Sequence, residues 1–387
     1  MIRKFFNTSI ILLAILMICS TAIGCKKKNN ITIEYPKFTS YLEIPGVTQK
    51  EIEAIENIKL SRSNFAYGVN YSTEAFLINN YRIGGFSALF CDWLSGLFEI
   101  PFKPQIVDWD ELISGLADKK IDFTGELTAT DERREIYFMT GPIAERSIKI
   151  MRIKKSEPLQ VLAKIRPLVY MFLEGTTAHD MVAPYLPDGY RSIFVGDYET
   201  AYHFLKNGTA DAFFEDGPAE AAFDTHDDVH AEDFYPLIYA PVSFTTQNPD
   251  LAPFISVIDK ALNSGFVYHL TMMYNQGYNN YLRQRLSMQL TFAEKMYITQ
   301  HRTPETAIKL AAEYDNYPVS FYNSYEKEWQ GIAIDVLREI EAYTGLCFTM
   351  AHDENTEWSE VLQMLEDGRA SMNTELLIVQ NRLGRFV

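Results

Sequence analysis

Hydrophobic and polar positions follow two periods along the first part of the chain, and each period predicts a kind of element. Residues 64–69 form a short run that predicts a strand, and residues 121–123 predict another. Between them, apolar residues recur at intervals of three and four through residues 86–98, which predicts an amphipathic helix with one broad apolar face. A further helix is expected to begin at Trp109.

The alternation continues as far as residue 282. It predicts strands at residues 147–153, 168–172 and 210–214, and helices after residue 177 and at residues 198–205, 218–223, 249–262 and 266–282. Strands that alternate with helices are typical of an α/β architecture with mostly parallel sheets.

Part of this pattern occurs twice. Trp109 and Trp358 lie 358 − 109 = 249 residues apart. The same offset pairs Glu111 with Glu360, Leu116 with Leu365, Asp118 with Asp367, Glu126 with Glu375, Leu127 with Leu376 and Arg133 with Arg382. A repeat of this length indicates a duplicated domain, because solenoid units repeat every 20–50 residues or so, about a fifth of this period at most. The second copy begins near residue 291 and stops at residue 387, so we expect it to be incomplete.

The N-terminus predicts export. Two basic residues at 3–4, an apolar run at 10–18 and small residues at 22–24 before Cys25 together form a signal sequence. The cysteine resembles that of a bacterial lipobox, which would make Cys25 the lipidated first residue of the mature protein. The alternative is an uncleaved signal anchor, for which the apolar run is at or below the lower length for spanning a bilayer. Both interpretations place the globular part outside the cytoplasmic membrane.

The composition excludes one class of partner. The formal net charge is −16 and no Lys/Arg stripe is present, which argues against binding to nucleic acid. Apart from the signal, the cysteines are Cys91 and Cys347, which form neither a disulfide framework nor a CxxC metal spacing. The loop 226–230 contains two His and two Asp, but no matching ligand set accompanies it, so we expect a solvated loop. Neither a metal nor a cofactor is expected.

Short motifs follow one another in an order that resembles a known family. They are a strand at 64–69, a loop with Tyr71 and Phe76, Gly85 before an aromatic helix, Trp109 at the next helix, and the runs 121–123, 128–133, 175–177 and 211–216. This ordered set resembles the family 3 bacterial solute-binding proteins over residues 60–285, and again over 305–387. The resemblance implies an α/β fold of the periplasmic-binding-protein-like type II, the Venus flytrap, in which two lobes hold a ligand in a cleft.

The resemblance also implies a domain organisation. Lobe one would comprise about residues 60–148 and 240–285, and lobe two the segment between them. The expected order is a signal peptide at 1–24, a lipidated tether at 25–54, a solute-binding domain at 55–288 and an incomplete second one at 291–387.

The resemblance carries several pocket residues over to this chain. Arg133 matches the arginine that clamps a ligand carboxylate, since a guanidinium fork pairs with two oxygens. Thr128 matches a pocket hydroxyl, and Thr176 and Thr177 would offer hydroxyls and amides at a helix N-terminus, where the dipole favours an anion. The alternatives are a surface ion pair of Arg133 with Glu132 or Glu135, and threonines that only cap helices.

Two further positions match the pattern, and others depart from it. Asp216 matches the carboxylate that pairs with a ligand amine, and Phe76 lies where an aromatic ring packs on the ligand, although it could simply be part of the core. Asn70 stands where amine-binding members often carry Asp, and Glu126 stands where small hydroxyl residues are common. In the second copy, the matching positions are Glu313 for Asn70, Tyr317 for Glu74, Glu375 for Glu126 and Arg382 for Arg133.

The predicted function is ligand binding rather than catalysis. A small carboxylate-bearing solute, an amino acid or a relative, would close the lobes, and a membrane signalling partner would read the closed state. Tandem flytrap domains behind a signal resemble the sensory region of transmembrane signalling proteins. The lipobox favours the alternative of a lipoprotein component of an ABC importer. A less favoured alternative is a dehydratase of cyclic acids on the same fold, with Glu126 or Glu215 as general acid or base.

Overall fold

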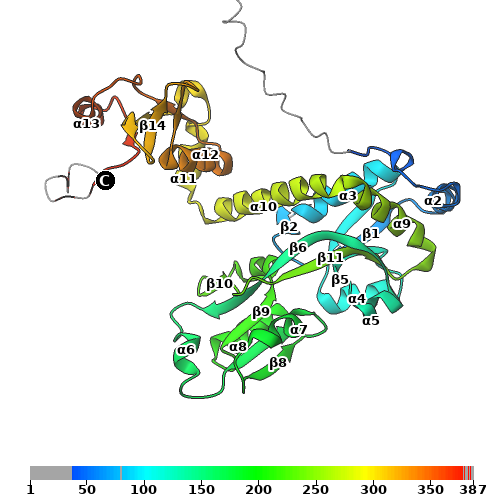
Figure 1. Cartoon of the computed structure of the whole chain (residues 1–387). Helices are drawn as coiled ribbons and strands as arrows, with labels where there is room; N and C mark the ends of the chain where they lie inside the picture. Colours follow the sequence, from blue (N-terminus) through cyan, green and yellow to red (C-terminus); the bar gives the residue numbers. More distant parts are fainter. Residues whose placement is uncertain (1–36, 79–80, 378, 380–381, 383, 385–387) are drawn as a thin grey trace, which may run out of the picture. The chain divides into compact units, whose positions relative to one another are not determined.

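The structure is a computed structural model that describes residues 37–78, 81–377, 379, 382 and 384 (Figure 1). The predicted signal and Cys25 lie outside the described residues. Among the residues that it does describe, no helix is long and apolar enough to cross a membrane.

A nine-stranded sheet organises residues 65–246. Its order is β4-β1-β5-β11-β6-β9-β7-β8, and β10 pairs with β6. The strands are β1 (Phe65–Val69), β4 (Phe102–Ile106), β5 (Phe123–Thr128), β6 (Phe138–Ile153), β7 (Val169–Leu173), β8 (Arg191–Val195), β9 (Ala212–Asp216), β10 (Val229–Asp233) and β11 (Tyr239–Thr246). Strands β4, β1 and β5 are parallel and belong to lobe one, and strands β8, β7 and β9 are parallel and belong to lobe two. The prediction of an α/β fold is therefore confirmed.

Two antiparallel strands join the lobes. Strand β6 pairs with β11 from Phe138 to Ser147, and then pairs with β9 and β10 from Ile148 onward (Figure 1). The sequence predicted a strand only at residues 147–153. The first half of β6 was missed because it contains Gly141, Pro142 and charged residues in place of an apolar alternation.

Helices cover the sheet of the first domain. They are α2 (Gln49–Ser61), α3 (Phe86–Phe98), α4 (Trp109–Ala117), α5 (Asp131–Ile136), α6 (Leu159–Leu162), α7 (Ala178–Val182), α8 (Tyr198–Lys206), α9 (Ala252–Ala261) and α10 (Val267–Gln289). Short 3-10 turns are η1 (Tyr41–Glu43), η2 (Ala183–Tyr185), η3 (Gly217–Phe223) and η4 (Pro249–Leu251), and a π turn, η5 (Leu262–Phe266), separates α9 from α10. Helices α3 and α8 agree closely with their predicted ranges.

Lobe one packs around aromatic rings. The ring of Phe65 lies 5.0 Å from Phe102, 5.4 Å from Phe123 and 5.1 Å from Phe254, between ring centroids. All four side chains are buried, and each such burial contributes about 1.5–3 kcal/mol. This rigid core holds the ends of β1 and β5 in place, where the candidate site lies.

The turn before α3 fixes the loop that carries Glu74. Gly85 has a φ of 99°, and a Cβ there would lie 2.2 Å from Glu74 O. The close approach allows the amide of Ser87 to donate to Glu74 O over 3.0 Å. Only glycine fits this backbone without strain.

Lobe two has a core on each face of its sheet. Successive residues of a strand point to opposite faces, so Phe214 packs with Tyr170 and Phe172 on one face, while Phe213 packs with Met171 and Leu205 on the other. The two cores hold β7 and β9, and the carboxyl ends of these strands with the turns that follow them carry most of the residues of lobe two that line the cleft.

Residues 292–373 form a smaller α/β arrangement. It contains α11 (Phe292–Gln300), η6 (Pro304–Thr306), β12 (Ile308–Ala311), β13 (Asp315–Asn316), β14 (Ser320–Asn323), β15 (Glu328–Gln330), α12 (Ile332–Thr344), β16 (Phe348–Met350), α13 (Trp358–Glu366) and β17 (Met372–Asn373). Its parallel sheet has the order β16-β12-β17, and lobe one has the order β4-β1-β5. A separate antiparallel sheet has the order β13-β14-β15, and lobe one has the antiparallel pair β2 (Phe76–Ile78) and β3 (Arg82–Gly84). Gly331 before α12 has a φ of 121°, like Gly85 before α3.

Candidate functional site

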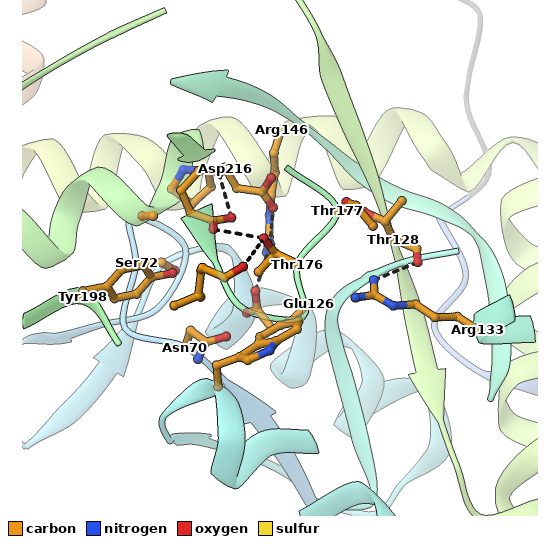
Figure 2. Close-up of a pocket in the computed structure, with 15 residues that line it drawn as sticks. Asn70, Ser72, Glu126, Thr128, Arg133, Arg146, Thr176, Thr177, Tyr198 and Asp216 are labelled. Atoms are coloured by element: carbon orange, nitrogen blue, oxygen red, sulfur yellow. Dashed lines mark hydrogen bonds and ion pairs between the residues drawn. The ribbon is translucent and has the colours of Figure 1, made fainter. Parts of the chain in front are cut away.

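A small cavity of about 30 Å³ lies where the carboxyl ends of the parallel strands from both lobes meet (Figure 2). Lobe one contributes Asn70, Ser72, Trp109, Glu126, Thr128 and Arg133. Lobe two contributes Leu173, Thr176, Thr177, Tyr198, Glu215 and Asp216. Open α/β sheets place their ligands at this edge, so the position of the cavity follows from the strand directions.

Arg146, on the connecting strand β6, holds a buried network of charges at the cavity. Its Nε and Nη2 donate to the two carboxylate oxygens of Glu74 over 2.9 and 2.8 Å. Its Nη1 donates to Oε2 of Glu126 over 2.8 Å and to Oδ2 of Asp216 over 3.3 Å (Figure 2). The Arg146 side chain is 4% exposed. One guanidinium therefore donates hydrogen bonds to three carboxylates, two from lobe one and one from lobe two.

Burial and charge shift the pKa values of this network in opposite senses. Burial works against the charge of Arg146, but the carboxylates of Glu126 and Glu74 outweigh it and hold its pKa well above the ordinary value. Burial raises the pKa of Glu126, and Arg146 offsets only part of that rise. The pKa of Asp216 is raised for the same reason. Burial therefore raises the pKa values of Glu126 and Asp216 by more than the shared guanidinium lowers them.

Glu215 is the most perturbed of these carboxyls. Burial and the neighbouring Asp216 raise its pKa to about 8. Its oxygens accept from the Asp216 amide over 3.0 Å and from Thr176 Oγ1 over 3.3 Å. Neither contact supplies a positive charge.

Arg133 lies at the cavity and touches both lobes. Its Nη1 donates to Thr128 O over 3.0 Å, and its Nη2 donates to Gly175 O over 2.9 Å. Burial lowers its pKa. Among the described residues, no salt bridge joins it to Glu132 or Glu135, the surface partners considered as an alternative. The guanidinium is held at the cleft by main-chain oxygens.

The threonines and Asn70 line the cavity in different ways. Thr176 Oγ1 donates to Leu173 O over 3.0 Å as well as contacting Glu215. Thr177 precedes α7 but makes no capping hydrogen bond, and its Oγ1 faces Met181 Sδ at 3.6 Å. Asn70 is held by Val107 O, to which its Nδ2 donates over 3.2 Å. The structure thus brings Asn70, Glu126, Thr128, Arg133, Thr176, Thr177 and Asp216 to one cavity.

Phe76 is placed elsewhere. Its side chain is 1% exposed, and its ring packs 5.6 Å from that of Tyr281, in a cluster with Ala221. It does not line the cavity, which matches the alternative that it belongs to the core.

Sequence reasoning missed Arg146 as a site residue and gave Glu74 no role. A charged residue in a strand normally faces solvent, so periodicity offers no sign that Arg146 is buried. The signal in the sequence that could have indicated Glu74 was Gly85, because this glycine fixes the loop after β1 that brings Glu74 to the cleft.

The second segment brings its two predicted carboxyls together. Asn316 Nδ2 donates to Glu375 Oε1 and, over 3.4 Å, to Glu313 Oε2. Tyr317 is 76% exposed and its ring lies 5.2 Å from that of Phe321. Arg382 Nη1 donates to Leu377 O over 3.3 Å. Among the residues the structure describes, no group of His, Cys, Asp and Glu is arranged to hold a metal ion.

Comparison with solved structures finds proteins of similar fold. A mutant of ArgBP from T. maritima is 24% identical, with a TM-score of 0.44 and coverage of 58% of this chain and 99% of that chain. AbpA from Streptococcus pneumoniae, an amino acid ABC transporter substrate-binding protein bound to L-arginine, is 13% identical, with a TM-score of 0.47 and coverage of 58% and 98%. The periplasmic VFT2 domain of Bordetella pertussis BvgS is 15% identical, with a TM-score of 0.48 and coverage of 58% and 97%.

Comparison with sequence profiles identifies the family. No curated protein sequence is significantly similar to the chain. The sequence profile of the bacterial extracellular solute-binding proteins, family 3, matches residues 65–275, which is more than half of the chain and includes every strand of the nine-stranded sheet. This chain therefore belongs to the bacterial extracellular solute-binding proteins of family 3.

Proposed function

We propose that this chain binds a small solute, an amino acid or a related carboxylate, outside the cytoplasmic membrane by closing its lobes around the ligand. The observation that carries the proposal is the position of Arg133, whose guanidinium lies at the cavity and donates to main-chain oxygens of both lobes. By exchanging these contacts, the guanidinium can pair bidentately with two oxygens of a ligand carboxylate.

Closure follows from the way in which the lobes are joined. Strands β6 and β11 run from one lobe into the other, so a change in their twist changes the width of the cleft. Thr128 and Arg133 come from lobe one, and Thr177 and Asp216 from lobe two. A ligand that contacts both sets favours the closed state, because the open state offers only one set at a time.

We propose that the closed state is the sensory input of a signalling protein. The support is the segment 292–373, whose strand order and glycine-led helix α12 resemble those of lobe one, as expected for a second domain of the same kind. The alternative is an importer lipoprotein anchored through Cys25. Deleting the gene and measuring uptake of the labelled ligand separates these roles, since loss of uptake supports the importer and unchanged uptake supports the sensor.

One observation favours a second candidate, a dehydratase of cyclic acids. Glu215, with a pKa of about 8, holds a proton at neutral pH and can act as a general acid. Loss of water from a cyclic hydroxy acid, followed by mass spectrometry and abolished in Glu215→Gln, would favour this enzyme over the binding protein.

The binding function can be tested with the purified chain and a panel of amino acids and organic acids. Trp109 lines the cavity, so a bound ligand should change its fluorescence as well as give heat in calorimetry. Trp109→Phe should lose most of the fluorescence change, whereas Trp93→Phe, which alters a ring packed on Phe266 away from the cavity, should keep it. If no amino acid or organic acid gives saturable binding, the proposed function is wrong.

A further inference from the structure

The cavity gathers more acidic than basic side chains. The carboxyls of Glu126, Glu215 and Asp216 line it, and the carboxyl of Glu74 accepts hydrogen bonds from Arg146, which also lines it. The guanidiniums of Arg133 and Arg146 are the cations at this place among the lining residues. Arg146 is shared by three of the carboxyls, and Arg133 donates to main-chain oxygens. The site therefore lacks a countercharge for part of its acid groups.

Glu126 shows the deficit at a single atom. Its Oε2 accepts from Arg146, but its Oε1 is buried and has no hydrogen-bond partner among the described residues. The side chain is 5% exposed, so it is almost fully withdrawn from solvent. A buried carboxylate oxygen without a donor is unfavourable, and the atom belongs to a residue that lines the cavity. The missing donor can come from a ligand.

Glu215 shows the same deficit on the side of lobe two. It is 3% exposed, and no salt bridge joins it to a cation in the described part of the chain. Its raised pKa, caused first by burial and then by Asp216, is the response of a carboxyl that has no countercharge. A positive group placed beside it would restore the charged form.

We propose that the ligand carries a protonated nitrogen on its side chain, an ammonium or a guanidinium group in addition to any α-ammonium, that binds between Glu126 and Glu215, so that the cleft selects cationic solutes such as basic amino acids. This inference rests on the proposed function and narrows its ligand class. The nitrogen supplies the donor that Glu126 Oε1 lacks and the countercharge that Glu215 lacks. Charge-assisted hydrogen bonds of this kind are stronger than neutral ones.

The size of the cavity indicates how the ligand enters. A space of about 30 Å³ holds one or two water molecules, so an amino acid requires the lobes to separate first. The contact of Arg146 with Asp216, at 3.3 Å, is its salt bridge to lobe two, whereas its shorter contacts are to Glu74 and Glu126 in lobe one. Opening therefore breaks this longer contact and leaves the acid groups of lobe two accessible to an entering cation.

The test compares probes that differ in charge at equal length. Purified full chain is titrated by calorimetry with L-lysine, with L-norleucine, which lacks the side-chain ammonium, and with cadaverine, which lacks the carboxylate. We expect lysine to bind at least tenfold more tightly than norleucine. Glu126→Gln and Glu215→Gln should each reduce this preference several-fold. Glu220→Gln is the matched control, because it removes a carboxyl of lobe two that pairs with Lys149 and does not line the cavity.

Each outcome decides one part of the proposal. Norleucine binding as tightly as lysine overturns the cation subsite and leaves the proposed function intact. Cadaverine binding as tightly as lysine supports the cation subsite and contradicts the carboxylate clamp at Arg133. A preference for lysine that survives both Gln variants overturns the assignment to Glu126 and Glu215. Failure of all three probes to bind overturns the choice of cationic solutes, whereas the proposed function itself is contradicted only if every amino acid and organic acid of the earlier panel also fails to bind. Thermal unfolding of each variant, compared with the parent, distinguishes loss of binding from loss of the fold.

Discussion

Replacing Arg146 by Met removes the guanidinium that contacts three buried carboxyls. In the unaltered protein, Arg146 donates to Glu74 over 2.9 and 2.8 Å, to Glu126 over 2.8 Å and to Asp216 over 3.3 Å. The side chains of Arg146, Glu74 and Glu126 are 4%, 4% and 5% exposed, so solvent cannot take over the lost contacts. The variant must therefore either bury uncompensated charge or protonate it.

The loss of stability in Arg146→Met can be estimated from the burial of these charged side chains. At an effective dielectric constant of about 20, one pair of charges about 4 Å apart attracts by about 4 kcal/mol. The cost of withdrawing Arg146 from water offsets much of the sum over three pairs, and breaking a buried pair by removing one partner costs about 3–5 kcal/mol. We expect this loss in the free energy of unfolding at pH 8, which lowers the melting temperature by about 6–20 °C for a domain of this size.

The loss should become smaller at acid pH. Burial already raises the pKa values of Glu126 and Asp216, and without Arg146 they rise further. A carboxyl with a raised pKa in the folded state contributes stability below its unfolded pKa and loses it as the pH rises through the folded pKa. The variant should therefore regain part of its stability when the pH falls from about 8 to about 5.

Urea denaturation followed by circular dichroism at both pH values measures the effect. Lys120→Met is the control, because Lys120 pairs with Asp118 over 2.9 Å at the surface, where the two side chains are 76% and 57% exposed. Exposed pairs contribute at most about 1 kcal/mol. Equal losses in the two variants, or a loss in Arg146→Met that does not change between the two pH values, would refute the reasoning.

Four further predictions concern ligand binding, packing, titration and anchoring. Arg133→Ala should weaken binding of the cognate ligand by about 2–5 kcal/mol at a nearly unchanged melting temperature. Arg134→Ala, which removes contacts to Met139 O and Thr140 O instead, should leave the affinity unchanged in the same calorimetric titration. Gly277→Ala should lower the free energy of unfolding in urea by about 1–3 kcal/mol, because its Cβ would lie 2.3 Å from the main-chain nitrogen of Phe86. Gly96→Ala in α3, with nothing within 4 Å, should raise that free energy by about 0.5–1 kcal/mol. The folded pKa of Glu215, about 8, lies above its ordinary value, so the parent should lose stability as the pH rises from 5 to 8 and Glu215→Gln should lose less; an equally steep decline in both would contradict this. Cys25→Ser should abolish acyl labelling and change the processed mass, whereas an uncleaved, unmodified N-terminus in the parent would favour the signal anchor.

Local periodicity predicted the elements that bury one face. Helix α3 begins and ends where the apolar spacing of residues 86–98 begins and ends. Its buried side chains Phe86, Phe90, Leu94 and Leu97 recur at this spacing, so the buried face can be recognised in the sequence. The first half of β6 could not be predicted in this way. Its residues are held by pairing with β11, about 100 positions further along the chain, and long-range pairing leaves no local period.

The residues of the site were predicted only in part, because some of them are brought together by contacts between distant parts of the chain. Residues in ordered motifs, such as Thr128 and Arg133, could be placed at the cavity because the order of these motifs resembles that of the family. Arg146 and Glu74 could not, because their contact joins positions 72 residues apart and a lone charged residue in a strand reads as exposed. Buried charge is a property of the assembled fold, whereas motif order is a property of the chain.

The two carboxyls at matching places in the proposed repeat bear on the role of Glu126. Glu126 lies in β5 and its Oε2 accepts from Arg146, while Glu375 follows β17 and its Oε1 accepts from Asn316. A carboxyl present for the sake of one structural partner should have the same kind of partner in both copies. The partners differ, one a guanidinium and the other an amide, while the carboxyl is the same. In the first domain its second oxygen, Oε1, is buried without a donor in the described structure, at a residue that lines the cavity. What the two positions share is therefore the carboxyl and not its partner, and this supports ligand recognition as the role of Glu126 beyond its contact with Arg146.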